Sequence, residues 1–386
     1  MKASLSKELI ERARAMIPTL KQRATNDEME RCVSKETVSE IKNAGLIGVM
    51  KPAKWGGHEL NPMVFSEIGM ALAEGDMAVA WVYGLWANHA YHLAFYDNQA
   101  QADVWSDTDK EPIISSSYSP AGKAIKVDGG YQLSGRWKWS SGSAHCDWLL
   151  LSSFPSDKPG EVVCFLVPRK DISIIDTWFV TGLKSTGSND IVVEDAFVPE
   201  YRGLAFSDLF KGTSPGTNEG PLYKLSPITV FYRVITLPMI GALQAMVDEF
   251  VVTGEARSTS SGPITENPDA LLALGQAIGA VEEMKHVQRQ TFERLMDLAE
   301  RGETASISDR MRYRYQSSYV AETCVQNAKA LFEATSGLAM MEEATSTGRI
   351  YRNLISARQH IGSQYRKYAR TLAADRFGAE SKDIML

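Results

Sequence analysis

The chain has 386 residues, of which 44% are hydrophobic and 23% are charged, and its formal net charge is −6. This balance is typical of a soluble globular protein with a large core, and the acidic charge argues against binding to nucleic acid or to an anionic membrane. No apolar run is long enough to span a bilayer or to form a signal peptide, so we expect a cytoplasmic protein. The four cysteines stand far apart, without the spacing of a metal or disulfide motif, and neither is expected.

Residues 1–110 are predicted to form a helical domain. Apolar residues recur at every third or fourth position over Leu5–Leu20, which is the pattern of one buried helix face. A second helix is expected after Ser34, a suitable N-terminal cap, and before Gly45, a suitable C-terminal stop. The helical pattern continues over residues 62–105.

The periodicity then changes to that of short strands, which favours a small antiparallel β domain over residues 111–212. The runs are rich in β-branched residues and are separated by turn residues such as Asp128-Gly129-Gly130. The predicted strands cover residues 124–127, 131–139, 148–154, 162–167, 172–175 and 191–193. The order of elements indicates a β domain inserted between helical ones.

Residues 213–386 are predicted to form a second helical domain. A connector rich in Gly, Pro and Ser occupies residues 212–221, and two long helices are expected at 271–301 and 308–335. Because the connection between these helices is short, an antiparallel bundle is favoured.

Three motifs in this order resemble the acyl-CoA dehydrogenase fold. Gly135–Trp148 is similar to the strand and turn that lie against the flavin ring in that fold, and Thr181–Glu200 resembles the strand pair that closes its β domain. Arg349–Ile361 resembles its active-site helix. The resemblance covers nearly the whole chain. It implies an α+β fold with an N-terminal helical domain, a central antiparallel β domain and a C-terminal four-helix bundle, assembled as a homotetramer.

Within that fold, the finer resemblance is to the oxygenase components of two-component flavin-dependent aromatic monooxygenases. Dehydrogenases of the fold place a catalytic glutamate near residues 360–361, where this chain has Gln-His-Ile-Gly over residues 359–362. An acyl-CoA dehydrogenase or oxidase that uses FAD is the alternative. A nucleic-acid-binding variant of the fold is disfavoured by the acidic charge.

This resemblance implies a reaction and its partners. A small aromatic or heteroaromatic substrate would be hydroxylated with O2 through a flavin C4a-hydroperoxide, as in the catabolism of aromatic compounds. A separate flavin reductase would supply the reduced flavin, because the chain has no GxGxxG or Walker motif for a nucleotide. Dehydrogenases of the fold hold the adenosine half of FAD with paired glycines. The corresponding stretch here, Leu331–Gly337, lacks the pair, which favours FMN (as FMNH2) over FAD.

The resemblance assigns catalytic roles to three residues. His360 stands at the dehydrogenase base position, and an imidazole with a pKa near neutrality suits acid–base work or hydrogen bonding to the substrate. His89 matches the active-site histidine of the monooxygenases. Ser141 is placed beside flavin N5 and C4a, where a hydroxyl can donate to a peroxide held at C4a and slow its loss as hydrogen peroxide. Ordinary core histidines and a turn serine are the alternatives, and a metal pair of His89 with His92 lacks further ligands.

Flavin contacts are expected from Ser117, Trp139, Ser141 and Arg257. In the resemblance, Ser117 touches the pyrimidine edge of the flavin, and Arg257 reaches the flavin phosphate of a neighbouring subunit. Trp139 would cover the isoalloxazine ring. The alternatives are a structural serine, a tryptophan in the β-domain core and an arginine in water at a helix end.

Overall fold

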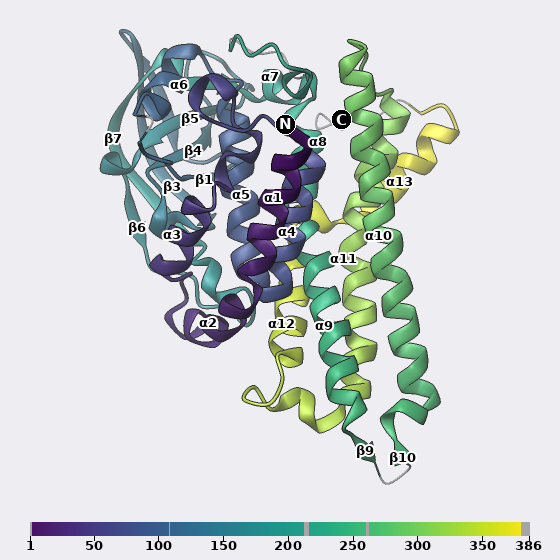
Figure 1. Cartoon of the computed structure of the whole chain (residues 1–386). Helices are drawn as coiled ribbons and strands as arrows, with labels where there is room; N and C mark the ends of the chain where they lie inside the picture. The colour runs from purple at the N-terminus through teal and green to yellow at the C-terminus, as the bar shows by residue number, and fades with distance from the viewer. Residues whose placement is uncertain (1, 108, 212–215, 260–261, 380–386) are drawn as a thin grey trace.

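The computed structural model describes residues 2–107, 109–211, 216–259 and 262–379. Helices and a β region lie side by side at one end of the molecule, and long helices pack against them and extend beyond them (Figure 1). The order of α, β and α elements confirms the predicted fold class. The domain limits stay predictions, and the one at residue 212 lies outside the described residues.

The N-terminal helices are α1 (Lys2–Ala15), α2 (Ile17–Glu30), α3 (Lys35–Asn43), α4 (Pro62–Gly75), α5 (Met77–Leu93) and α6 (Asn98–Trp105), with short 3₁₀ turns η1 (Ile47–Met50) and η2 (Ala53–Trp55). The apolar stripe over residues 5–20 therefore spans two helices rather than one, because Pro18 lies in the first turn of α2 and starts a new helix. Helix α5 is buried over nearly its whole length. It forms the central wall on which the candidate site is built.

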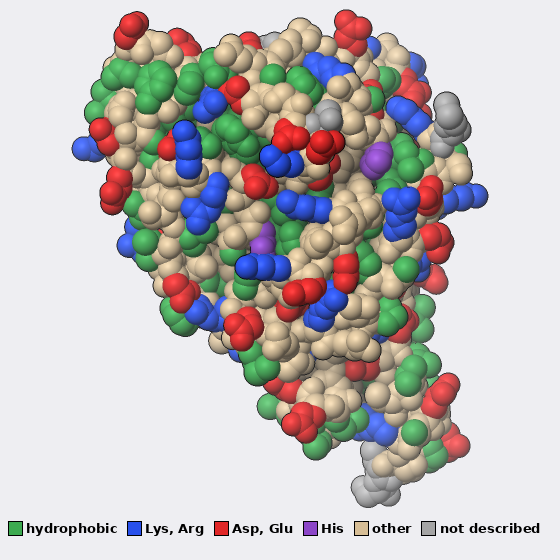
Figure 2. Space-filling view, turned by 60° about the vertical axis from the view of Figure 1, so that its left-hand side comes forward, with side chains coloured by type: hydrophobic (Ala, Val, Ile, Leu, Met, Phe, Trp, Pro, Cys, Tyr) green, Lys and Arg blue, Asp and Glu red, His purple; other side chains and the backbone are tan. Residues whose placement is uncertain are grey.

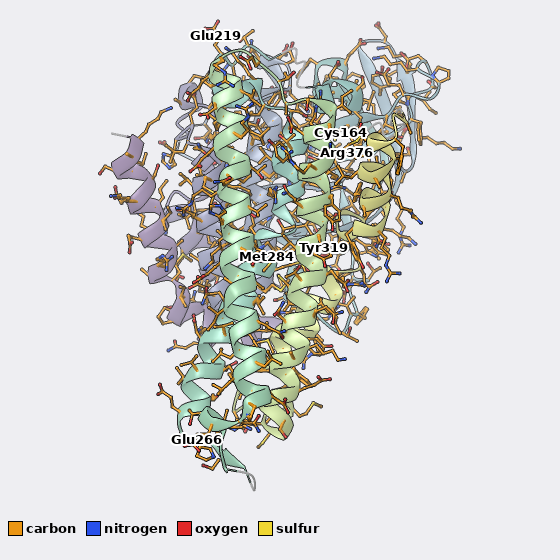
Figure 3. The ribbon with its side chains drawn as sticks, turned by 90° about the vertical axis from the view of Figure 1, so that its right-hand side faces the viewer. Cys164, Glu219, Glu266, Met284, Tyr319 and Arg376 are labelled. Atoms are coloured by element: carbon orange, nitrogen blue, oxygen red, sulfur yellow. The ribbon has the colours of Figure 1, made fainter. Side chains whose placement is uncertain are left out.

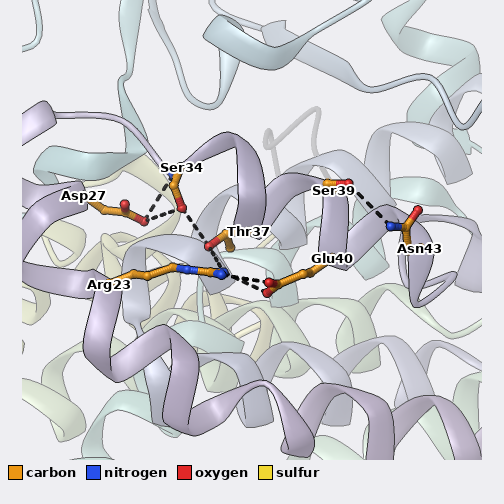
Figure 4. Close-up of polar contacts among 7 residues, drawn as sticks. All are labelled: Arg23, Asp27, Ser34, Thr37, Ser39, Glu40 and Asn43. Carbon is orange, nitrogen blue, oxygen red and sulfur yellow. Dashed lines mark hydrogen bonds and ion pairs between the residues drawn. The ribbon is translucent and has the colours of Figure 1, made fainter.

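A polar network joins α2 to α3 (Figure 4). The guanidinium of Arg23 donates to both carboxylate oxygens of Glu40 at 2.8 Å. Ser34 occupies the N-cap position of α3, as predicted, but its hydroxyl contacts Thr37 Oγ1 at 2.9 Å and its backbone N–H donates to Asp27. The start of α3 is thus fixed by contacts to α2 and to its own first turn.

The β region consists of two four-stranded sheets. One has the order β1 (Ile114–Ser117), β4 (Trp148–Ser153), β5 (Val163–Pro168) and β8 (Gly203–Ala205); the other has β2 (Lys123–Val127), β3 (Gly130–Ser140), β7 (Asn189–Pro199) and β6 (Ser173–Ile175). Short turns η3 (Ser143–His145), η4 (Arg169–Asp171), η5 (Lys184–Thr186) and η6 (Glu200–Arg202) connect them. All pairs are antiparallel except β1 with β4. The polar β1 and the three-residue β8 were not predicted.

The C-terminal part contains α7 (Phe206–Lys211), α8 (Pro227–Val234), α9 (Leu237–Glu255), α10 (Pro268–Glu300), α11 (Ile307–Thr335), α12 (Thr347–Ala357) and α13 (Tyr365–Arg376), with β9 (Ser258–Thr259), β10 (Gly262–Pro263), η7 (Pro221–Lys224), η8 (Ile264–Glu266), η9 (Ser336–Met340) and η10 (Ile361–Ser363). Helices α10 and α11 match the two predicted long helices within a few residues. They run side by side along the molecule, with Met284 on one and Tyr319 on the other (Figure 3).

One helical stretch, Pro227–Glu255, is long and apolar enough to cross a membrane by length and composition alone. Since 89% of its most apolar window is buried inside the protein, it has the character of a core helix. On the face shown in Figure 2, acidic and basic side chains are interspersed. That face offers no stripe of one charge for a polyanion.

Candidate functional site

Ser141 and His360 converge on Trp81, a residue of α5. The indole Nε1 of Trp81 donates to Ser141 Oγ at 3.3 Å. The ring of His360 lies against the same indole, edge to face, with centroids 5.8 Å apart. Segments from the N-terminal, central and C-terminal parts of the chain therefore meet at one place.

The hydroxyl of Ser141 belongs to a chain of hydrogen bonds with a fixed direction. Thr186 donates to the carbonyl of Leu183 at 2.8 Å, so it must accept from Ser188 at 2.7 Å. Ser188 has then used its proton and accepts from Ser141, also at 2.7 Å. Because Ser141 gives its proton to Ser188 and accepts from Trp81, one lone pair of its oxygen is left for another donor. The expectation that its hydroxyl donates to a peroxide is therefore wrong for this arrangement, since its proton is already used.

The turn around Ser141 also turns Trp139 outward. A register shift between β3 and β7 at residues 137–140 marks a bulge, and Trp139 has a φ of 62° there. Its side chain is 67% exposed, so the alternative of a core tryptophan is wrong. An exposed aromatic face next to an oxygen acceptor fits a flavin ring, whose reduced form carries a proton on N5.

His89 is a neutral hydrogen-bond acceptor. It is fully buried, and its Nδ1 lies 2.8 Å from the carbonyl of Ile114, which can only accept. The proton of the neutral ring is therefore on Nδ1, and Nε2 accepts from the hydroxyl of Ser116 at 2.9 Å. Burial lowers the pKa of His89 to about 4, partly offset by the bond to Ile114.

His360 is a neutral hydrogen-bond donor, and this corrects two expectations. It does not lie on a helix, because α12 ends at Ala357 and His360 precedes η10. Its pKa is not near neutrality, because burial first and the charge of Arg314 second lower it to about 4. Its Nδ1 accepts the backbone N–H of Gly362 at 3.0 Å, so the proton is on Nε2 and that atom can donate.

His92 and Tyr118 extend the site beyond the residues found by sequence. His92 Nδ1 lies 2.5 Å from the hydroxyl of Tyr118, and the ring of Tyr118 meets that of His89 edge to face. The spacing of the two histidines on α5 was the available signal, but nothing in the sequence placed Tyr118 beside them. In the part of the chain that the structure describes, no group of three or more His, Cys, Asp or Glu side chains is placed to hold a metal.

Ser117 borders this cluster, because Ser116 beside it contacts His89, whereas Arg257 lies at the far tip of the bundle. The hydroxyl of Ser117 donates to the carbonyl of Lys138 at 2.9 Å and ties β1 to β3. Arg257 follows α9 at the far tip of the bundle, where Nη2 donates to the carbonyl of Thr335 at 2.8 Å and Nη1 is buried with no hydrogen-bond partner among the described residues. A cavity of about 420 Å³ in the same region is lined by the start of α10 and the end of α11. Its lining includes the carboxylates of Asp269 and Glu333 but not Arg257, so the cavity itself does not indicate a phosphate site.

The buried histidines predict that the fold loses stability in acid. The pKa of His89 is about 4 and that of His92 is well below its usual value, both because of burial, whereas 6.5 is the ordinary value. Below about pH 6.5 the unfolded chain therefore binds more protons at these histidines than the folded chain does. Their contribution to the free energy of unfolding is fully present above that pH and is lost as the pH drops toward 4. For His89 alone the loss between pH 7 and pH 5 is on the order of 2 kcal/mol.

Urea unfolding at pH 7 and pH 5 measures this loss. Asp76 acts in the opposite direction, because burial raises its pKa to about 6 and the folded state then holds the extra proton. Because His89 and His92 together outweigh Asp76, the urea concentration at the midpoint of unfolding should still be lower at pH 5 than at pH 7. In a His92→Gln variant the difference between the two pH values should shrink. Equal midpoints for the natural chain would show that the histidines are not held neutral.

Gly142→Ala is expected to destabilise the turn that holds Ser141 by about 2–4 kcal/mol, from a left-handed backbone and an overpacked contact. Gly142 has a φ of 70°, and a Cβ there would lie 2.4 Å from Nε1 of Trp86. Gly129→Ala is the matched control, because its φ is 72° and nothing lies within 4 Å of the added atom. Urea unfolding should show the larger loss for Gly142→Ala; equal losses would mean that Trp86 moves away freely.

Comparisons with known proteins identify the family and the fold of the chain. The family described as "Acyl-CoA dehydrogenase, C-terminal domain" matches residues 233–365. The chain is 31% identical to the flavin-dependent monooxygenase oxygenase subunit HsaA of Rhodococcus jostii, over 98% of this chain and all of that protein. It is 27% identical to the FADH2-dependent resorcinol hydroxylase oxygenase component of a Rhizobium species, over 97% and 95% of the two chains. The crystal structure of 3-HSA hydroxylase from Rhodococcus sp. RHA1 superimposes with a TM-score of 0.93 at 30% identity, over 98% of this chain and 99% of that one.

Proposed function

Because the chain belongs to the oxygenase subunits of the flavin-dependent monooxygenases, we propose that it hydroxylates a small aromatic or heteroaromatic compound, with O2 and with reduced flavin from a separate reductase. The relatives support an oxidoreductase that depends on reduced flavin. The choice of FMN over FAD and a cytoplasmic location are further parts of the proposal.

The tautomer of His360 is the observation that carries the proposal. Its Nδ1 lone pair is occupied by the N–H of Gly362, and its Nε2 already bears the proton. The neutral ring therefore offers a donor and has no free lone pair with which to take a proton from an acyl thioester. The alternative of an acyl-CoA dehydrogenase needs a base at this position. A hydrogen-bond donor suits an oxygenated aromatic substrate.

In this proposal the residues of the site have separate tasks. Bound reduced flavin supplies the electrons and activates O2. Trp139 covers the flavin ring, and the free lone pair of Ser141 accepts the proton of flavin N5. His89 Nε2 accepts the substrate hydroxyl in place of Ser116, and His360 Nε2–H donates to a substrate oxygen. The buried wall of α5 excludes water.

We also propose a homotetramer that places the tip of one bundle against a neighbouring subunit. Apolar side chains are exposed near that tip, with Val252 71%, Leu272 59% and Met340 72% exposed. Arg257, which is half-buried, lies in the same region, and its guanidinium is proposed to bind the neighbour's flavin phosphate. Light scattering should give four times the mass of the chain. A monomer would count against both the assembly and this role of Arg257.

The proposed activity is tested with the purified chain, a flavin reductase, NADH, and FMN or FAD. With ¹⁸O2 and a panel of phenols and indoles, we expect a product that carries one ¹⁸O atom, detected by mass spectrometry. Leaving out the reductase and NADH is the control and should abolish the product. If no compound is oxygenated, and an acyl-CoA instead bleaches the bound flavin without oxygen, the dehydrogenase alternative is correct.

A further inference from the structure

Two arginines are buried beside the candidate site without any carboxylate partner. Arg314 on α11 is 3% exposed and Arg233 on α8 is 2% exposed. Neither forms an ion pair with Asp or Glu within the residues that the structure describes. The two arginines lie in the same region, because the ring of Tyr232, the residue before Arg233, has its centroid 3.4 Å from the Cζ of Arg314. Burial and the charge of Arg314 lower the pKa of Arg233 to about 10. Burying a charge without a counter-charge is strongly unfavourable.

The guanidinium of Arg314 is held in place but only partly bonded. Its Nη2 donates to the hydroxyl of Tyr368 on α13 at 2.5 Å. The rings of Tyr232 and Tyr368 lie 3.4 and 4.2 Å from its Cζ, so the group has an aromatic ring within cation–π reach on two sides. Helices α11 and α13 lie side by side along this part of the bundle (Figure 3). The Nε and Nη1 atoms are buried, and no described residue forms a hydrogen bond with them.

Stacking alone does not account for this arrangement. A buried cation–π contact offsets only part of the cost of removing one charged group from water. Arg233 adds a second charge, and within the part of the chain that the structure describes its guanidinium donates to a neutral group, Thr291 Oγ1, at 3.2 Å. The missing component is an anion at the free side of Arg314.

Helix α11, which carries Arg314, packs against η10, the turn that His360 caps. The charge of Arg314 contributes to the lowered pKa of His360, and the ring of His360 lies against Trp81, which holds Ser141. An anion on Arg314 would therefore be carried by the same molecule that meets His360. A carboxylate suits the site better than a phosphate, because it is flat, has a single charge and needs no more donors than the two that are free.

We propose that Arg314 binds a carboxylate of the substrate, so that the substrate is a phenol with a carboxylate on a short side chain. This inference rests on the proposed function. Arg233 adds to the positive potential, and Tyr232 and Tyr368 fix the plane of the guanidinium. The carboxylate holds the aromatic ring with its hydroxyl end toward His360 and His89.

The test compares acids with their uncharged amides. The probes are 4-hydroxybenzoate, 4-hydroxyphenylacetate and 3-(4-hydroxyphenyl)propanoate, each paired with its amide, titrated calorimetrically into the flavin-free chain and then used as substrates with the reductase system. We expect at least one acid to bind tenfold or more tightly than its amide. Arg314→Met should bring the ratio of acid to amide affinity near one, because it weakens the binding of the acid and leaves the binding of the amide unchanged. Arg314→Lys, which keeps the charge, should retain part of the preference, and it decides the matter if Arg314→Met does not fold.

The ratio of acid to amide is measured within one variant, so a general loss of stability does not change it. An exposed arginine, Arg294→Met on α10, is the matched control and should keep the natural ratio. The inference is overturned if every acid and amide bind alike, or if Arg314→Met keeps the preference. Oxygenation of neutral phenols without any preference for acids would leave the proposed function standing. Binding of an acid that depends on Arg314, with no oxygenation of any phenol, would overturn the function and leave the anion subsite.

Discussion

His360→Ala is expected to lower the yield of hydroxylated product per O2 consumed by roughly tenfold or more, because one hydrogen bond to the substrate is worth about 1–3 kcal/mol. The lost donor is Nε2–H, whose position is fixed by the bond from Gly362 to Nδ1. O2 consumption should continue, since the residues assigned to the flavin are unchanged, and the balance of O2 should appear as H2O2. Oxygen-electrode and peroxide assays with the preferred phenol measure both quantities.

Two variants separate this effect from a general disturbance. His360→Gln keeps an N–H donor on a side chain of similar reach and should recover part of the product yield. His286→Ala removes an exposed histidine from α10 and should match the natural protein. The pH profile is a further check: with a pKa of about 4, His360 stays neutral from pH 5 to 8 and should cause no step in yield near 6.5. A natural yield in His360→Ala would remove this residue from the site.

The sequence predicted the fold well because periodicity reports burial. The long helices α10 and α11 show one buried stripe each, and most strands show β-branched runs between turns. Strand β1 was not predicted because Ile114–Ser117 is mostly serine. The hydroxyls of these serines form hydrogen bonds with residues far along the chain. Helix α9 was not predicted because it is apolar on nearly all sides. Its sequence therefore has no apolar stripe of helical periodicity that would distinguish it from a strand.

The candidate site was only partly predictable, because its chemistry depends on which atom each side chain bonds. Resemblance supplied His89, Ser141 and His360, but their protonation follows from a carbonyl, an N–H and burial that no motif encodes. The expected neutral pKa of His360 was wrong for this reason. Arg314 and Arg233 gave no signal at all, since buried and solvated arginines look alike in a helical pattern.

Ser141→Ala is expected to raise the rate at which O2 and reduced flavin yield H2O2 without any substrate by roughly tenfold, the effect of losing one bond of about 1–3 kcal/mol. The variant removes the lone pair proposed to accept the proton of flavin N5. It also leaves Nε1 of Trp81 without its acceptor and Ser188 without its donor. Stopped-flow mixing of the reduced-flavin complex with aerated buffer, with peroxide detection, measures the rate.

The direction of the hydroxyl chain makes a second variant informative. Ser188→Ala leaves the oxygen of Ser141 in place but removes the acceptor of its proton, so Ser141 becomes free to turn. If the oxygen atom itself is what matters, Ser188→Ala should release peroxide at a rate between those of the natural protein and Ser141→Ala. Equal rates for the two variants would mean that the chain to Thr186, and not the Ser141 oxygen, holds the site. A natural rate in Ser141→Ala would contradict its assignment beside N5, whereas the His360→Ala defect depends on substrate and would stand independently.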